Sequence, residues 1–285
     1  MLGSYVAEQA AASGWETWAS YSTHSVALED CRMIQLDLAD AAQVSEAVED
    51  IQPDVVIHTA GRVKPDFCEQ HKRVAFESNV IGTYNIVRGA DKAGAHLVHI
   101  STDVVFNGER NPYREGDSPS PPNYYGLTKA GGEAAVLAAH TDWAVVRTSV
   151  IYGPSKFAHL NSFSDEVIES LRAGKPFMAF TDQRRCPIPA WNLADVLLEI
   201  AERRLTGVYH AVCPESSTRY EFARKIAEVF GYDHKLVKPI TMDRVDAIAR
   251  RPKTLVLDVT ATARTLHAPL LGFEEGIREL RQRMG

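Results

Sequence analysis

Residues 40–61 read DAAQVSEAVEDIQPDVVIHTAG, and this stretch decides the fold. Asp40 predicts the N-cap of a helix, and the apolar residues that follow at helical spacing predict an amphipathic helix, which Pro53 ends. The apolar run Asp54–His58 then predicts a buried strand. With a short strand expected just upstream at Met33–Leu36, the segment forms one strand–helix–strand step of a parallel sheet.

The same alternation of short apolar runs and longer amphipathic stretches continues on both sides of this segment. Further helices are predicted at Leu2–Ser13, Phe76–Ala93 and Tyr125–His140. Further strands are predicted at Glu16–Tyr21, His96–Ile100 and Trp143–Ile151, with a loop at Asn107–Pro122 and a turn at Tyr152–Pro154. The first two thirds of the chain therefore predict an α/β protein with a doubly wound parallel sheet.

The alternation fades after this turn, which indicates an appended lobe. Helices are predicted there at Phe163–Ala173, Asn192–Arg203, Tyr220–Gly231 and Glu274–Met284, and strands at Gly207–Ala211 and Leu255–Leu257. We therefore expect a larger domain over residues 1–154 and a smaller α/β lobe that occupies mainly residues 155–285. Some segments of the second part are expected to return to the larger domain.

The composition is that of a globular protein: 285 residues, 45% hydrophobic and 24% charged. A formal net charge of −6 gives no positive field for a polyanion, so no nucleic-acid polymer is expected as a partner. No apolar run approaches the ~20 residues that span a bilayer, and no secretory signal is visible, so we expect no membrane partner and a cytoplasmic location. The cysteines lie far apart, without histidines at ligand spacing, which predicts no metal site: Cys31, Cys68, Cys186 and Cys213.

Tyr125 and Lys129 stand four residues apart, so a helix places the phenol and the ammonium on one face. A free tyrosine has a pKa near 10, and proton transfer near neutrality requires a pKa lower by roughly three units. A neighbouring ammonium lowers the pKa of a phenol, whereas burial raises it, so Lys129 supplies the cation that this chemistry needs. Tyrosine–lysine pairs at this spacing are also common on exposed helices. Whether this pair is catalytic therefore depends on the neighbouring motifs.

Thr102 and Asp103 follow the predicted strand His96–Ile100, at the edge where open α/β sheets bind ligands. The Thr102 hydroxyl at this edge is placed to hydrogen-bond a substrate carbonyl. A threonine that only caps the loop backbone is the alternative interpretation.

Several short motifs follow one another along the chain, and their order and spacing are specific: Leu36–Leu38, Pro53–Gly61, Asn79–Thr83, Ser101–Gly108, Tyr125–Lys129, Arg147–Gly153, Asp182–Pro187 and Arg251–Pro252. In these motifs the chain resembles the extended short-chain dehydrogenase/reductases, and within them the dTDP-4-dehydrorhamnose reductase-like (RmlD-like) sugar-nucleotide group. The resemblance covers nearly the whole chain. It implies a Rossmann-like fold that binds NADP(H) or NAD(H), with a smaller substrate-binding lobe.

The resemblance also implies the reaction, which is reduction of a nucleotide-linked 4-keto sugar. It makes Tyr125 the proton donor to the carbonyl, Lys129 the ligand of the ribose that lowers the tyrosine pKa, and Thr102 the residue that orients the carbonyl. The cofactor-binding residues implied are Gly3, Asp37, Leu38, Thr59, Ala60, Gly61, Asn79, Tyr125 and Lys129. The substrate-binding residues implied are Thr102, Asp103, Val150, Arg184, Arg185 and Arg251.

Some of these residues have an equally good structural interpretation. Asp37 fits a helix-capping carboxylate as well as an adenine contact, and the three arginines fit ion pairs as well as phosphate contacts. The strand Glu16–Tyr21 is not followed by an acidic residue to hold a ribose hydroxyl, which mildly favours NADP. Arg62 and Lys64 are candidates for its 2′-phosphate.

The sequence departs from the family pattern at its start. Gly3 stands in the place of the last glycine of the family's glycine-rich turn, and about ten residues of the first strand and turn are missing. Because this strand lies between two others, its loss leaves backbone groups unpaired at about 1–3 kcal/mol each. We therefore expect a start site that was assigned too late, or else a rearranged sheet that no longer binds a dinucleotide.

Two other functions remain open. One is an epimerase or dehydratase that keeps its cofactor, although Val104 stands after Asp103 where dehydratases tend to carry an acidic residue. The other is a non-catalytic, RmlD-like binding or regulatory subunit, which the shortened start favours and the intact tyrosine–lysine pair disfavours. The sugar also stays open, because Val104 and Val150 replace aromatic residues of the rhamnose-pathway reductases. A homodimer is compatible with each alternative.

Overall fold

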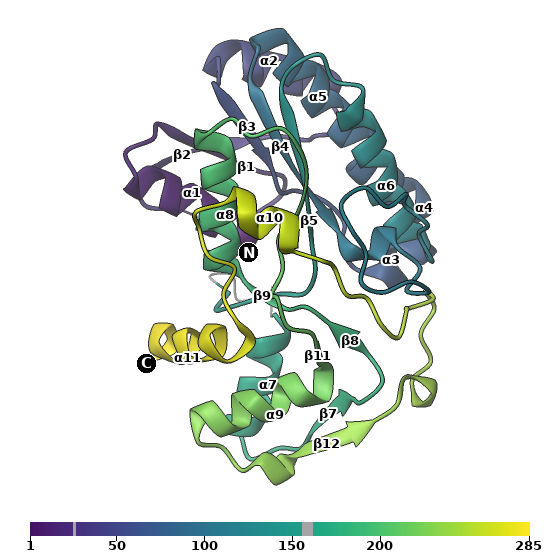
Figure 1. Cartoon of the computed structure of the whole chain (residues 1–285). Helices are drawn as coiled ribbons and strands as arrows, with labels where there is room; N and C mark the ends of the chain where they lie inside the picture. The colour runs from purple at the N-terminus through teal and green to yellow at the C-terminus, as the bar shows by residue number, and fades with distance from the viewer. Residues whose placement is uncertain (25–26, 156–161) are drawn as a thin grey trace.

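The computed structural model describes residues 1–24, 27–155 and 162–285, and a parallel sheet forms its centre (Figure 1). The sheet has the strand order β10-β5-β4-β3, and all of its neighbours run parallel. Its strands are β3 (Val55–His58), β4 (His96–Thr102), β5 (Trp143–Thr148) and β10 (Gly207–His210). The predicted α/β fold with a parallel sheet is confirmed.

Helices cover both faces of this sheet, because successive strand residues point to opposite sides. Leu97 and Val145 pack against α2 (Ala41–Ile51) and α5 (Gly82–Ala93). On the other face, Val98, Ile100, Ala144 and Val146 pack with α1 (Leu2–Ala12) and α8 (Ala190–Glu202). Asp40 caps α2 as predicted, since its carboxylate accepts hydrogen bonds from the amides of Ala42 and Gln43. The result is a doubly wound arrangement.

Two strands stand outside the central sheet. β1 (Thr17–Tyr21) and β2 (Cys31–Gln35) pair only with each other, in parallel. β1 and β3 both line one large cavity, and in the described residues no strand joins them. The sequence predicts unpaired backbone groups on the two neighbours of the missing strand. Within the ranges that the structure describes, these neighbours are β1 and β3, each of which pairs with a strand on one side only.

The lobe lies at the carboxyl end of the central strands (Figure 1). Its helices are α7 (Phe163–Arg172), α9 (Arg219–Phe230) and α11 (Phe273–Met284). Its short strands pair as β7 (Phe177–Phe180) with β12 (Val237–Ile240), β8 (Arg184–Arg185) with β11 (Ser217–Thr218), and β6 (Ile151–Tyr152) with β9 (Ile188–Pro189). β10, by contrast, returns to the central sheet beside β5.

Three predicted elements differ from the structure. The strand predicted at Trp143–Ile151 is divided: β5 ends at Thr148, and Ile151 begins β6, which pairs with β9 in another sheet. The strand at Leu255–Leu257 is wrong: this stretch is an irregular segment with isolated bridges at Thr254 and Leu257. Its leucines are buried because the segment crosses the loop after β4, where Tyr113 bonds the backbone of Val256. The helix predicted at Phe76–Ala93 is interrupted, because a π-helical turn at Glu77–Ile81 precedes α5.

Helices α3 (Pro65–Gln70), α4 (Lys72–Phe76), α6 (Tyr124–Leu137) and α10 (Thr260–Thr265) complete the described helices of four residues or more. None of the helices in the described ranges is both long enough and apolar enough to cross a membrane.

Gly132 allows α6 to pack closely on the π-helical turn, since a Cβ there would lie 2.9 Å from the Asn79 carbonyl oxygen. We predict that Gly132→Ala lowers the free energy of unfolding by about 1–3 kcal/mol, because the backbone must shift. Urea denaturation measures this change. Gly116→Ala is the matched control, because its Cβ would meet nothing within 4 Å. Equal stability of the two variants would contradict the role of this contact.

Candidate active site

One cavity of about 1980 Å³ opens where the central strands end. Its walls include Thr59 to Gly61 after β3, Ser101 to Val104 at the end of β4, and Ser149 to Ile151 after β5. Lobe residues of α7 and α9 also line it. The cavity therefore occupies the edge where α/β sheets bind their ligands.

Tyr125 and Thr102 meet in this cavity. Asn123 caps α6 by accepting a hydrogen bond from Gly126 N at 2.9 Å, and Gly126 lies so close to the Val104 carbonyl that a side chain would overlap it. The start of α6 is thereby held against the end of β4. Tyr125 is 8% exposed, and the Thr102 side chain is near enough to its hydroxyl to lower the phenol pKa. Thr102 caps the turn after β4 by accepting from Val104 N, which confirms the alternative interpretation of this threonine as a cap of the loop backbone.

The pKa of Tyr125 differs from the expectation. Burial raises it above its ordinary value of 10, and the nearby Thr102 side chain lowers it by less. Lys129 does not contribute, although both side chains line the same cavity. The predicted lowering of this pKa by the ammonium is thus not found in the structure, because the ammonium is bonded elsewhere.

Lys129 is turned toward β4. Its Nζ donates to the Ile100 carbonyl at 2.6 Å and lies 3.2 Å from His99 Nε2. A buried ammonium takes the nearest acceptors, and here they belong to the strand. Burial lowers the pKa of Lys129 to about 8. The His99 ring lies 5.1 Å from that of His58, whose pKa burial lowers to about 3.

Asn79 lies behind the cavity and positions its walls. Its Oδ1 accepts from Arg62 N at 2.7 Å, and its Nδ2 donates to Arg62 O and to Thr128 Oγ1. Asn79 thereby connects the loop after β3 to α6, between Tyr125 and Lys129. It is not among the residues that line the cavity, so the structure gives it a positioning role and no direct exposure to a ligand.

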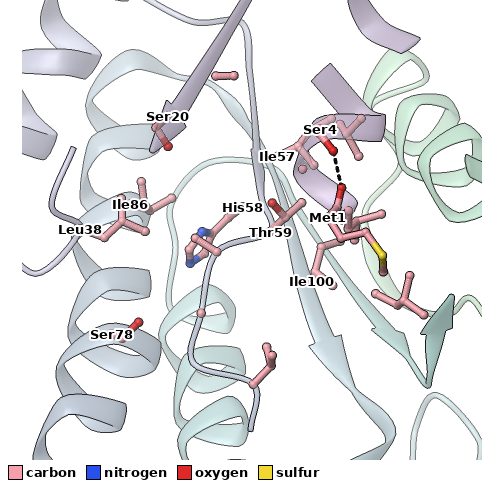
Figure 2. Close-up of a pocket in the computed structure, with 18 of the residues that line it drawn as sticks. Met1, Ser4, Ser20, Leu38, Ile57, His58, Thr59, Ser78, Ile86 and Ile100 are labelled. Atoms are coloured by element: carbon pink, nitrogen blue, oxygen red, sulfur yellow. Dashed lines mark hydrogen bonds between the residues drawn. The ribbon is translucent and has the colours of Figure 1, made fainter. Parts of the chain in front are cut away.

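The remaining predicted cofactor residues line the cavity. Figure 2 shows two of them, Leu38 and Thr59. A Cβ on Gly3 would lie 2.8 Å from Thr59 Oγ1, and a Cβ on Gly61 would lie 2.9 Å from Asn79 Oδ1. These glycines let the Thr59 and Asn79 side chains approach the backbone closely, so a larger residue at either position would displace the cavity wall. Leu38 offers an apolar wall, and Asp37 accepts from Ala39 N. Asp37 therefore does not cap α2. The residues present fit an NAD(P) molecule.

The predicted substrate residues divide into two groups. Asp103, Val150, Arg185 and Arg251 line the cavity. Asp103 accepts from Ser149 Oγ at 2.6 Å, and burial raises its pKa. Arg184 does not line this cavity, because its guanidinium turns toward Glu221, at 3.1 Å. Arg184 therefore lies outside the site and forms an ion pair, which is the alternative to a phosphate contact that the sequence left open.

Sequence reasoning missed His99, Gln183 and Arg219. Gln183 and Arg219 line the cavity, and His99 contacts Lys129 behind it. No spacing signal marks Arg219, since it follows a lobe strand that is two residues long. Only the tertiary contact between α9 and the end of β7 brings it to the site.

A doubly wound parallel sheet, with a Tyr-x-x-x-Lys helix and a threonine facing one cavity at the strand ends, defines an extended short-chain dehydrogenase/reductase-type protein. The chain belongs to the RmlD substrate binding domain family, whose profile matches residues 1–285.

Similar proteins agree with this assignment. The chain is 33% identical to the probable low-salt glycan biosynthesis reductase Agl14 of Haloferax volcanii, over 91% of this chain and 87% of that protein. It is 34% identical to methionine adenosyltransferase 2 subunit beta of Xenopus tropicalis, over 87% of this chain and 75% of that protein. The crystal structure of dTDP-4-dehydrorhamnose reductase from Bacillus anthracis in complex with NADP is similar, with a TM-score of 0.83 and 29% identity. That match covers 89% of this chain and 90% of the other.

The lowered pKa of Lys129 predicts a pH-dependent stability. Between pH 8 and 10.5 the folded protein releases this proton while the unfolded chain keeps it, so the free energy of unfolding rises with pH in that window. We expect wild type to gain about 1–3 kcal/mol relative to Lys129→Met across it. Urea denaturation at a series of pH values measures the difference.

Lys238→Met is the control for this prediction, because Lys238 is exposed on β12. Its stability curve is expected to run parallel to that of wild type across the same pH range. A parallel curve for Lys129→Met as well would contradict the burial of the ammonium.

Proposed function

We propose that this protein is an NAD(P)H-dependent reductase of a nucleotide-linked 4-keto sugar, similar to dTDP-4-dehydrorhamnose reductase. The observation that carries the proposal is that Tyr125, Thr102 and Lys129 line one large cavity at the strand ends. The reductase from Haloferax volcanii and the NADP-bound reductase from Bacillus anthracis support it.

The residues divide the work as follows. Burial keeps the Tyr125 phenol protonated at neutral pH, which is the state that a proton donor needs. Thr102 orients the carbonyl, and Tyr125 Oη passes its proton to the carbonyl oxygen. The buried tyrosinate left behind lacks water, so it needs a cation. Lys129, on the same face of α6, is the cation within the same cavity.

A bound NADPH or NADH supplies the hydride. The residues that would hold it are Gly3, Asp37, Leu38, Thr59, Ala60, Gly61 and Lys129, all of which line the cavity. Arg62 and Lys64 line it too, and they are the cations for a 2′-phosphate. Together with the NADP in the Bacillus anthracis reductase, they favour NADP over NAD.

The second candidate is a binding subunit of another enzyme. The observation that favours it is the likeness to methionine adenosyltransferase 2 subunit beta from Xenopus tropicalis, which is named as a subunit. In this case the cavity would bind its ligand without turnover, and Tyr125 and Thr102 would form part of its wall.

Tyr125→Phe separates the two functions. For a reductase, we predict that this variant keeps NADPH binding and loses turnover of dTDP-4-dehydrorhamnose by about 10²- to 10⁴-fold, the contribution of a general acid. NADPH fluorescence measures binding, and its absorbance measures turnover. Tyr124→Phe is the control on the same helix, because Tyr124 does not line the cavity and stands beside Lys72.

Three outcomes would contradict the reductase assignment. They are unchanged turnover in Tyr125→Phe, an equal loss of turnover in Tyr124→Phe, and NADPH binding by wild type without any reduction of nucleotide-linked 4-keto sugars. The last outcome would favour the subunit, and co-purification with a methionine adenosyltransferase then tests that assignment.

A further inference from the structure

Arg219 is a lobe residue whose charge faces the active-site cavity. It begins α9, directly after Thr218, which caps that helix by accepting a hydrogen bond from Glu221 N. Its side chain is partly buried and lines the same cavity as Thr102 and Tyr125. The proton transfer described above does not use it.

Two contacts fix the orientation of the Arg219 guanidinium. Its Nε donates to Gln183 Oε1 at 3.1 Å, and its central carbon lies 4.4 Å from the centre of the Phe163 ring. An arginine has five N–H donors, and only the one at Nε is used here. The two terminal nitrogens donate to no residue within the described ranges. They are therefore held in place and left open to a ligand.

The other lobe arginines are already occupied. Arg184 is paired with Glu221, and Arg251 donates to Asp66 at 2.8 Å. Arg185 donates to the carbonyl oxygens of Arg184 and Pro252, so its terminal nitrogens hold two backbone segments together. Of the four arginines, Arg219 alone lines the cavity with both terminal nitrogens unpaired in the part of the chain that the structure describes.

The local charges leave Arg219 without compensation. Burial and the charge of Arg185 lower its pKa to about 10, although the carboxylates of Asp103 and Glu166 act in the opposite direction. Asp103 is already bonded to Ser149 and lies 3.8 Å from Arg185 Nε. Glu166 lines the cavity, but the described residues include no ion pair between it and Arg219. A partly desolvated cation of this kind gains free energy when an anion arrives.

We propose that Arg219 binds the diphosphate of the nucleotide-linked substrate, an inference that rests on the proposed function. A guanidinium fork matches two phosphate oxygens at once, and Gln183 and Phe163 hold this fork in advance. Arg219 belongs to the lobe and Tyr125 to the sheet domain (Figure 1). The substrate thus spans the two, with its keto sugar at Tyr125 and its phosphates at Arg219.

Binding of nucleoside diphosphates to the NADPH-loaded protein tests this role. dTDP, UDP and GDP are titrated by calorimetry beside thymidine, uridine and guanosine, and the tightest diphosphate is kept for the variants. We expect it to bind wild type at least 10-fold more tightly than its nucleoside. Arg219→Met should weaken diphosphate binding by about 10- to 100-fold and leave the nucleoside unchanged.

Two further variants distinguish the loss of the Arg219 guanidinium from a general loss of the fold. Arg219→Lys keeps the charge without the fork, so its diphosphate affinity should fall between those of wild type and Arg219→Met. Arg224 lies on the same helix and is exposed beside Tyr220. The Arg224→Met variant should therefore bind the diphosphate as tightly as wild type. Thermal unfolding checks that each variant is folded.

Two results would overturn the role of Arg219. In the first, wild type binds none of the three diphosphates more tightly than the corresponding nucleoside. In the second, Arg219→Met binds the diphosphate as tightly as wild type does. Failure of the proposed reductase function has a different signature. In that case NADPH is not oxidised with any nucleotide-linked keto sugar, while diphosphate binding still depends on Arg219.

Discussion

The packing of the start of α6 against the end of β4 is the constraint on which the site depends, because it brings Tyr125 and Thr102 into one cavity. Gly126 permits this packing, since a side chain there would overlap the Val104 carbonyl, and Gly132 lets the same helix lie close to the Asn79 carbonyl. Asn79 adds a second connection, from the loop after β3 to Thr128 on the same helix. The phenol therefore faces the cavity from a rigid support, and burial keeps it protonated as a donor must be.

Buried charge distinguishes this cavity from an ordinary crevice. Lys129 is held on the Ile100 carbonyl, Asp103 on Ser149, and Arg219 on Gln183, so each charge is oriented before any ligand arrives. Asp103 is paired with Arg185, whereas Lys129 and Arg219 form no ion pair within the described residues, which a folded chain tolerates where binding or chemistry repays the cost. The cation needed by a tyrosinate and the cation suited to a phosphate lie in one cavity, on the sheet domain and on the lobe.

Much of the fold was predictable, because strands such as Asp54–His58 carry an unambiguous apolar run and Asp40 marks a helix start. The irregular path of Leu255–Leu257 was not, since a buried segment that crosses a loop has the same apolar pattern as a strand. In the site, spacing placed Tyr125, Thr102 and Lys129 around one cavity. It could not reveal that Lys129 bonds β4, or that Arg184 pairs with Glu221 while Arg219 lines the cavity, because these outcomes depend on contacts distant in sequence.

The central claim is that Tyr125 is the acid in carbonyl reduction, and a change in the acidity of its phenol tests that claim most directly. Fluorotyrosine at position 125 lowers the phenol pKa with little change in shape. The pH profile of turnover should then lose its activity at a lower pH than that of the unmodified enzyme, because the donor is deprotonated earlier. A profile whose alkaline limb stays in place would contradict the account.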